Sequence, residues 1–201
     1  LMRYRNQENH SKSNRFSAEV GKYFPKFKTN ASISYGNTTS ISDAFLSDAF
    51  LGDIEFKNKN NSQTYGFKFN NTYFSWMSLD YNMNLSRTKQ DSRNRTLGIN
   101  KGYNHNLALF FYPIENHTIG FNWDQVNTVN GANKYNNPFY DISYQFTWAK
   151  KKIDFEVKWM NISNRRVFET FNLDGQYGST TYTRIQLRPS QFMFTVKFNF
   201  K

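Results

Sequence analysis

Strict alternation between apolar and polar residues recurs along nearly the whole chain and limits the folds that it can adopt. The stretch WMSLDYNMNLS places apolar side chains at every second position over 77–85, with polar ones between them. The stretches YDISYQFTW (140–148) and IDFEVKW (153–159) repeat the pattern, and QFMFTVKFNFK ends the chain with it. Because successive side chains of a strand point to opposite faces, this period predicts strands with one apolar and one polar face.

Weaker alternation brings the total to about nine segments, the additional ones lying at 16–24, 29–35, 65–70, 97–112 and 118–123. Each segment is close to the roughly 9–11 residues that a tilted strand needs to cross a bilayer. No apolar run approaches the roughly 18 residues of a membrane-spanning helix. The aromatic content of 19% also favours strands. The expected fold is therefore all-β, an antiparallel transmembrane β-barrel with about 9–10 of its strands in this chain.

The connections between the predicted strands alternate in length. Short ones lie at 24–28, 73–76, 112–117 and 148–152, and long polar ones are expected as outer loops at 36–62, 88–96, 128–138 and 163–187. Short turns on one rim and long loops on the other are typical of outer-membrane barrels. A last strand that runs toward the short-turn rim places the C-terminus on the periplasmic side, as in such barrels.

Aromatic residues gather beside the four short turns, as in the interfacial girdle of a membrane barrel. The predicted girdle consists of Tyr23, Phe24, Tyr73, Phe74, Trp76, Tyr112 and Trp148.

The alternation also assigns each residue to a face. Lipid-facing positions are predicted at Leu79, Tyr81, Ile142, Phe146, Phe155, Val157, Phe194 and Val196. Polar positions facing the lumen are predicted at Glu19, Lys68, Asp80, Asn82, Asp141, Asp154, Glu156, Lys158 and Lys197. These charges suit either a polar conduit or mutual neutralisation, for example between Glu156 and Lys158, and the second is favoured for any single residue.

The formal net charge of +11 raises the question of a nucleic-acid partner. The basic residues are scattered, however, and many lie at predicted turns, whereas a nucleic-acid-binding protein gathers them on one element. Basic turns beside an anionic lipid surface explain the same charge. No nucleic-acid partner is therefore expected.

Catalytic and metal-binding patterns are missing from the sequence. There is no Cys, no HExxH, no GxSxG and no Gly-rich phosphate loop. By parity, His105 and His117 belong to the apolar rows and not to a polar interior, where a hydrolase needs them. We expect no enzyme and no cofactor.

The C-terminal quarter resembles a known family. IDFEVKWMNISNRRVFETF, a polar loop and then YTRIQLRPSQFMFTVKFNF are similar to the C-terminal end of TonB-dependent receptor-type barrels, in the Bacteroidetes-type outer-membrane β-barrel branch. The matching motifs are Trp159-x-Asn161-Ile162 and Leu187-Arg188-Pro189 before the alternating last strand. Farther upstream, KYFPKFKTNASISY and LALFFYPIENHTIGFNW look like periplasmic hairpins of that family.

The resemblance implies a barrel of about 22 strands with a plug, in the outer membrane of a Gram-negative bacterium. It implies partners as well: outer-membrane lipid, a TonB system, surface lipoproteins and the barrel-assembly machinery. That machinery would recognise the terminal signal formed by Phe192, Phe194, Val196, Phe198 and Phe200, which Lys201 extends by one residue.

An odd number of about nine strands does not suit a closed single-chain bacterial barrel. We therefore expect residues 1–201 to form one barrel segment, the C-terminal part of a larger wall that the remaining N-terminal part or another chain completes. If residues 1–10 supply a further strand, a closed barrel of about ten is the rival. The expected function is uptake of a nutrient or ligand; the alternatives are a non-transporting scaffold or subunit of an outer-membrane complex, and a soluble all-β adhesin.

Overall fold

A computed structural model describes residues 11–48, 52–92, 95–173 and 180–198. These residues form eleven strands and two single-turn 3₁₀ helices. The strands are β1 (Ser11–Phe24), β2 (Thr29–Asp48), β3 (Gly52–Asn71), β4 (Met77–Ser92), β5 (Arg95–Phe111), β6 (His117–Asn130), β7 (Asn133–Trp148), β8 (Ile153–Met160), β9 (Val167–Leu173), β10 (Thr180–Gln186) and β11 (Gln191–Phe198). The 3₁₀ turns are η1 (Pro25–Phe27) and η2 (Ala149–Lys151).

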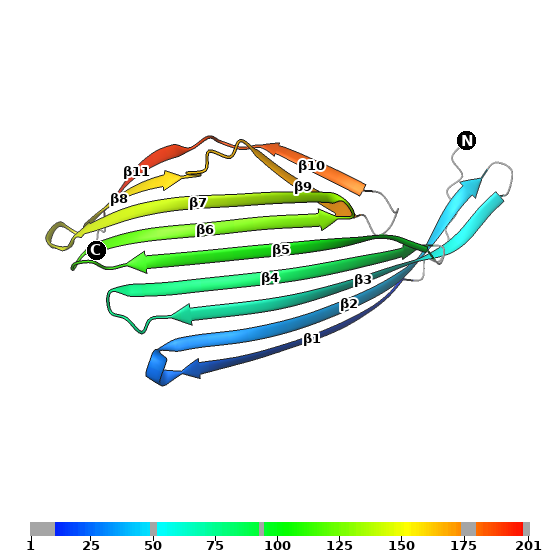
Figure 1. Ribbon diagram of the computed structural model, residues 1–201, viewed down its shortest axis with the longest axis horizontal. Coiled ribbons are helices and arrows are strands. Elements are labelled where there is room, and N and C mark those ends of the chain that lie inside the picture. Colours follow the sequence, from blue (N-terminus) through cyan, green and yellow to red (C-terminus); the bar gives the residue numbers. More distant parts are fainter. Residues whose placement is uncertain (1–10, 49–51, 93–94, 174–179, 199–201) are drawn as a thin grey trace.

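Nine of the strands form one antiparallel sheet in the order β1-β2-β3-β4-β5-β6-β7-β8-β11 (Figure 1). Each of the nine alternating sequence segments coincides with one strand of this sheet, so the predicted all-β antiparallel class is confirmed. Strands β9 and β10 pair only with each other, as a separate hairpin inserted between β8 and β11.

Four tight connections lie at the left-hand end of the sheet in Figure 1. Residues in the left-handed backbone region close three of them: Lys28 after η1, Asn116 before β6 and Lys152 after η2. Asn tolerates this region better than most residues, whereas a Lys there carries a steric cost of roughly 1–2 kcal/mol. The short connections predicted from the sequence are therefore present, and all of them lie on one rim.

The segments expected as long loops at 36–62, 88–96 and 128–138 are mostly strand instead. Strands β2 and β3 pair from Thr29↔Asn71 to Asp48↔Gly52, and β6 pairs with β7 out to Asn130↔Asn133. The apolar alternation is absent from stretches such as 57–64, where polar side chains occupy both faces, but ladder hydrogen bonds need no apolar face. Asn61, for example, donates from Nδ2 to Thr39 Oγ1 (2.8 Å) across the β2–β3 pair.

The fourth expected loop, 163–187, also contains regular structure. It holds the β9–β10 hairpin, paired from Val167↔Gln186 to Leu173↔Thr180. Most of its positions hold Val, Ile, Thr, Phe or Tyr, and β-branched and aromatic residues of this kind favour strands.

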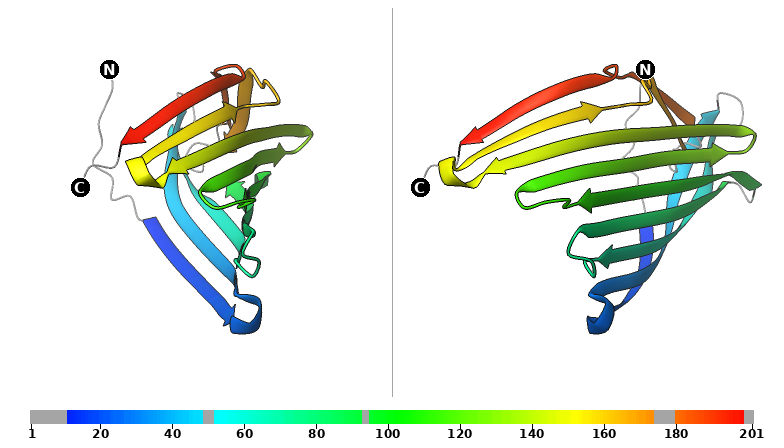
Figure 2. Two further views of the ribbon diagram at one scale, coloured as in Figure 1. Left: turned by 90° about the vertical axis from the view of Figure 1, so that its left-hand side faces the viewer. Right: turned by 60° about the vertical axis from the view of Figure 1, so that its left-hand side comes forward.

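The sheet is strongly curved and is not closed. Figure 2 shows it as an open trough with β1 and β11 at the two margins. Within the described residues, β1 pairs only with β2 and β11 only with β8, so the outer edge of each is unpaired.

Candidate functional site

One face of the sheet carries a continuous belt of apolar side chains. The register lines up Leu79, Leu109, Phe121, Ile142, Trp159 and Phe192 as one row across six strands. Parallel rows lie on both sides of it, and neighbouring rings stack, as Phe155 does with Phe194 at 6.5 Å between centroids. The eight residues predicted to face lipid all lie on this face.

The belt has no protein against it in the described part of the chain. No hydrophobic residue there is buried, and Phe192 and Phe194 are 71% and 64% exposed. The accessible surface is 14673 Å² for a chain of 23.9 kDa, whereas a compact soluble monomer of that mass exposes roughly 9,900 Å². A sheet with this surface needs an apolar medium or partner to cover its belt.

The predicted aromatic girdle residues cluster at the short-turn end, and all seven are exposed. Tyr73, Phe74 and Trp76 form a chain of ring contacts at 5.1 and 5.3 Å between centroids. Tyr112 is hydrogen-bonded through its hydroxyl to Ser78 Oγ (3.0 Å). Of the girdle residues that lie on strands, Phe24 and Trp148 belong to the apolar face, whereas the pairing of Tyr23 with Asn30 assigns Tyr23 to the polar face.

The opposite face is polar, and the nine residues predicted to face the lumen share it by register. Six of them form ion pairs that join two strands of the sheet. Glu19 pairs with Lys68 at 3.4 Å, Asp141 with Lys158 at 3.3 Å, and Glu156 with Lys197 at 3.9 Å. The sequence predicts that Glu156 and Lys158 neutralise each other, but each pairs with a residue on an adjacent strand instead. Side chains directly opposite each other on adjacent strands are closer than side chains two positions apart on one strand.

A hydrophilic hollow of about 490 Å³ lies on this face over β1–β4. Ser32 Oγ and Lys68 Nζ both donate to Glu19 Oε1 there, and Asp80 accepts from Asn70. Gly21 opens the floor of the hollow, since a Cβ at that position would lie 3.1 Å from Ser32 Cβ. The hollow offers carboxylate, amide, hydroxyl and ammonium groups to water or to a polar solute.

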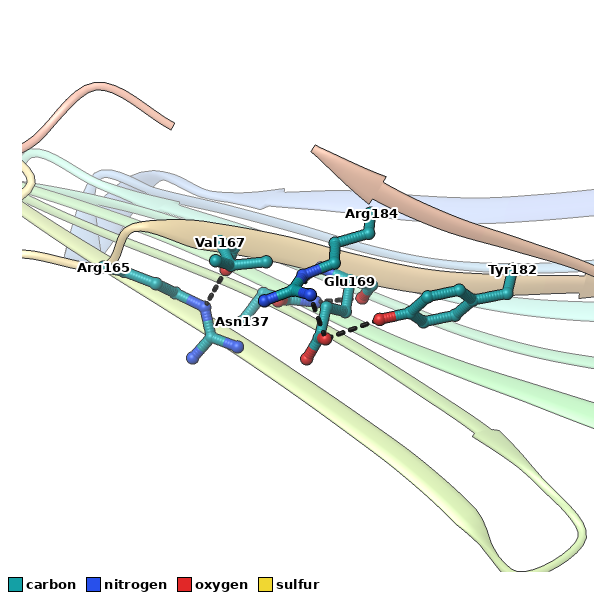
Figure 3. Close-up of polar contacts among 6 residues, drawn as sticks. All are labelled: Asn137, Arg165, Val167, Glu169, Tyr182 and Arg184. Carbon is teal, nitrogen blue, oxygen red and sulfur yellow. Dashed lines mark hydrogen bonds and ion pairs between the residues drawn. The ribbon is translucent and has the colours of Figure 1, made fainter. Parts of the chain in front are cut away.

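The β9–β10 hairpin lies across the polar face of β5–β7, inside the curve of the sheet (Figure 2). Its main anchor is Asn137, which is fully buried. Asn137 Nδ2 donates to the carbonyl of Glu169 (2.8 Å), and Asn137 Oδ1 accepts from the backbone N–H of Glu169 (3.2 Å) (Figure 3). One side-chain amide thus replaces a strand neighbour for β9.

Ring contacts and further polar contacts hold the hairpin along its length. Phe139 stacks on Phe168 (6.4 Å between centroids), and Tyr135 contacts Phe171 and Tyr182. Asn100 Nδ2 also donates to the carbonyl of Phe171 (3.2 Å). Because Tyr135 and Phe139 are apolar residues on the polar face, they provide the surface on which the hairpin packs.

A charged cluster lies on the hairpin itself. Tyr182 donates its O–H to Glu169 Oε1 (2.6 Å), and Arg184 Nε lies 3.9 Å from the same oxygen (Figure 3). The hydrogen bond to Glu169 raises the pKa of the Tyr182 phenol above its ordinary value.

The chain turns from the sheet into the hairpin through Asn161. Its backbone is left-handed (φ 51°), and its N–H donates to Asp141 Oδ1 (2.9 Å). Its side chain donates to the carbonyls of Arg165 (2.8 Å) and Arg188 (2.9 Å) and accepts from the Arg165 N–H (3.0 Å). Asn161 therefore joins the exit from β8 to the entry into β11.

Sequence reasoning missed the hairpin and its anchor. Asn137 lies in a stretch expected as loop and has no feature that separates it from its neighbouring Asn residues. A usable signal was the parity of Tyr135 and Phe139, which places aromatic rings in the row that is polar from 141 to 147. Of the predicted assembly-signal residues, Phe192 to Phe198 lie on β11, and Phe200 lies outside the described residues.

Two of the three histidines, His105 and His117, lie on the apolar face, away from the polar hollow, and His10 lies outside the described residues. His105 Nδ1 is hydrogen-bonded to Tyr81 OH (2.9 Å), and His117 Nδ1 to Tyr144 OH (2.6 Å). Over the residues that the structure describes, no group of three or more His, Asp or Glu side chains could hold a metal ion.

Neither 3₁₀ turn nor any other described segment is a helix long and apolar enough to span a membrane. No protein-family model, curated protein or solved structure matches the chain.

Proposed function

We propose that the chain forms part of the wall of a transmembrane β-barrel in the outer membrane of a Gram-negative bacterium, with the apolar belt against lipid and the polar face toward a lumen. The observation that carries this proposal is the belt itself. It crosses all nine strands of the sheet, and no described hydrophobic residue is buried. A soluble adhesin would have to leave this surface in water, which folded soluble proteins avoid.

The height of the belt supports the proposal. On β4 the apolar positions run from Met77 to Leu85, which is roughly 26 Å along the strand at about 3.3 Å per residue. With a tilt of about 40°, this spans roughly 20 Å, and the exposed rings at the turns extend it to the height of about 25 Å that is usual for the lipid-facing band.

The unpaired outer edges of β1 and β11 support a larger barrel. In the hydrocarbon core an unpaired strand edge leaves N–H and C=O groups without partners, at a cost of several kcal/mol each. We therefore propose that further strands, from the remaining N-terminal part of the protein or from another chain, complete the wall.

The function that fits best is uptake of a nutrient or ligand through a TonB-dependent receptor-like barrel. The ion-paired polar face and the hairpin docked across it are features expected of a lumen whose opening is controlled. In this proposal a TonB system supplies the energy, surface lipoproteins present the ligand, and the barrel-assembly machinery recognises β11. A scaffold or subunit role is the second candidate, favoured by β2 and β3, whose 20 residues each exceed what a bilayer requires.

Conductance in planar bilayers tests the proposal. Removal of residues 167–186 from the protein, with a short Gly-Ser linker in their place, is expected to raise the single-channel conductance of the inserted barrel. The matched control is the full-length protein with the single substitution Tyr182→Phe, which keeps the hairpin. An unchanged conductance after the deletion would count against a lumen at this face and favour the scaffold role. Failure of the wild-type protein to insert would refute the membrane proposal.

A further inference from the structure

Basic side chains lie on the apolar face just beyond the belt, toward the long-hairpin end. Arg87 on β4 is paired with Lys101 on β5, and the preceding cross-strand pair on that face is Leu85 with Tyr103. Lys59 on β3 belongs to the same face farther out. The face therefore changes from apolar to cationic within one pair of residues.

Arg87 and Lys101 face each other, and no carboxylate of the described residues neutralises them. Directly opposite side chains have Cβ atoms about 4.5–5.5 Å apart, and like charges in this arrangement destabilise a sheet. Both residues are exposed, and among the described residues neither has a carboxylate within 4.0 Å. The nearest acidic position along β4, Asp91, is engaged by Lys89 (3.0 Å) and by the Thr96 hydroxyl (2.7 Å). An anion bound between Arg87 and Lys101 would remove the repulsion.

An apolar groove of about 470 Å³ lies on the same face within the belt, over β1–β4. Its lining combines the small side chains of Ala18 and Val20 with the rings of Tyr35 and Phe67. Met83 lies at its β4 side, four residues from Arg87, which is roughly 13 Å along the strand. An extended apolar chain in the groove would therefore reach the basic pair with its polar end.

We propose that this surface binds one phosphorylated membrane lipid, with its phosphate between Arg87 and Lys101 and an acyl chain in the groove. The inference rests on the proposed membrane location. Charge complementarity identifies the occupant: a phosphate oxygen accepts from both cations, which charge-assisted bonds favour strongly. A free phosphate would leave the groove empty, and a neutral lipid would leave the two like charges unrelieved.

Native mass spectrometry tests the site on the protein purified from membranes in a nonionic detergent. The probe is dioleoyl phosphatidic acid, compared with dioleoylglycerol, which lacks the phosphate, and glycerol 3-phosphate, which lacks the chains. We expect phosphatidic acid to bind at least about tenfold more tightly than either. In the variant R87Q/K101Q its affinity falls by about tenfold or more, while that of dioleoylglycerol is unchanged.

Two further variants separate the parts of the site. Ala18→Phe fills the groove and is expected to weaken both dioleoyl lipids without affecting glycerol 3-phosphate. The control K150Q/K151Q removes the same charge at η2, on the opposite rim, and should bind phosphatidic acid as the wild type does.

The inference is overturned if R87Q/K101Q binds phosphatidic acid as tightly as the wild type, or if glycerol 3-phosphate binds equally well. Flotation of the protein with phosphatidylcholine vesicles separates this failure from failure of the proposed function. A protein that inserts into these vesicles but shows no phosphatidic acid preference refutes the lipid site alone. A protein that does not insert refutes the membrane location on which the site depends.

Discussion

Replacement of Ile142 by Arg tests whether the apolar face contacts lipid. Ile142 is 41% exposed and lies in the row between Phe121 and Trp159. Six residues separate it from Trp148 at the rim, or roughly 20 Å along the strand and roughly 15 Å in height at a tilt of about 40°. Ile142 is thus close to the middle of a band about 25 Å tall.

At that depth an Arg on the lipid side costs about 2–4 kcal/mol, which lowers the folding equilibrium constant roughly 30- to 700-fold. The matched control is Asn122→Arg, at nearly the same height on the polar face, where Asn122 pairs with Ala108 and Asp141. Since water can solvate the guanidinium on this face, we expect a change within about 0.5 kcal/mol.

The assay is reversible urea unfolding in phosphatidylcholine vesicles, followed by tryptophan fluorescence. Equal destabilisation by Ile142→Arg and Asn122→Arg would refute the assignment of the two faces. A larger decrease in the free energy of unfolding for Asn122→Arg than for Ile142→Arg would show that the two faces are assigned the wrong way round.

Three other predictions concern the hairpin and its junction. Asn137→Leu leaves the backbone groups of Glu169 without partners and is expected to weaken hairpin docking by about 1–3 kcal/mol, measured as faster amide exchange and proteolysis within 167–173. The pKa of the Tyr182 phenol is raised in the folded state, so its hydrogen bond to Glu169 stabilises the hairpin fully below the ordinary phenol pKa of about 10, and this stabilisation is lost as pH rises through the raised pKa. Tyr182→Phe should therefore remove a phase at high pH from the absorbance titration of the phenolates. Loss of a phase near the ordinary phenol pKa would contradict this. Asn161→Ala removes four side-chain hydrogen bonds at a left-handed residue and should cost about 1–3 kcal/mol, whereas Asn164→Ala, which removes two, should cost less in the same urea assay.

The sequence was sufficient for the sheet because alternation depends on local chemistry. Residues such as Leu79 and Asp80 differ enough in polarity to assign both the strand and its faces, and the four tight turns follow from short gaps between alternating segments. Much of the outer part of β2 and β3 could not be predicted because stretches such as 57–64 have a polar residue at every position, and polarity then no longer distinguishes a strand from a loop.

The hairpin could not be predicted for a different reason. Its position depends on Asn137, whose amide meets the backbone of Glu169, 32 residues away in the chain. An Asn-rich sequence does not indicate which amide makes such a contact, because the contact depends on the curvature of the folded sheet. The motif at Asn161 carries the family resemblance, but its physical basis, a left-handed residue that joins two strand ends, follows only from the contacts.

Single-cysteine labelling along β4 tests the central claim most directly, since residues 1–201 contain no Cys of their own. Spin labels at every position from 77 to 86, in the protein inserted into phosphatidylcholine vesicles, would be probed with oxygen and with a water-soluble nickel complex. We expect the accessibility of the labels to alternate along the strand. Oxygen should enhance the relaxation of labels at Leu79, Tyr81 and Met83, and the nickel complex should enhance the relaxation of labels at Asp80 and Asn82. Equal access of the nickel complex to both rows would contradict a lipid-facing belt.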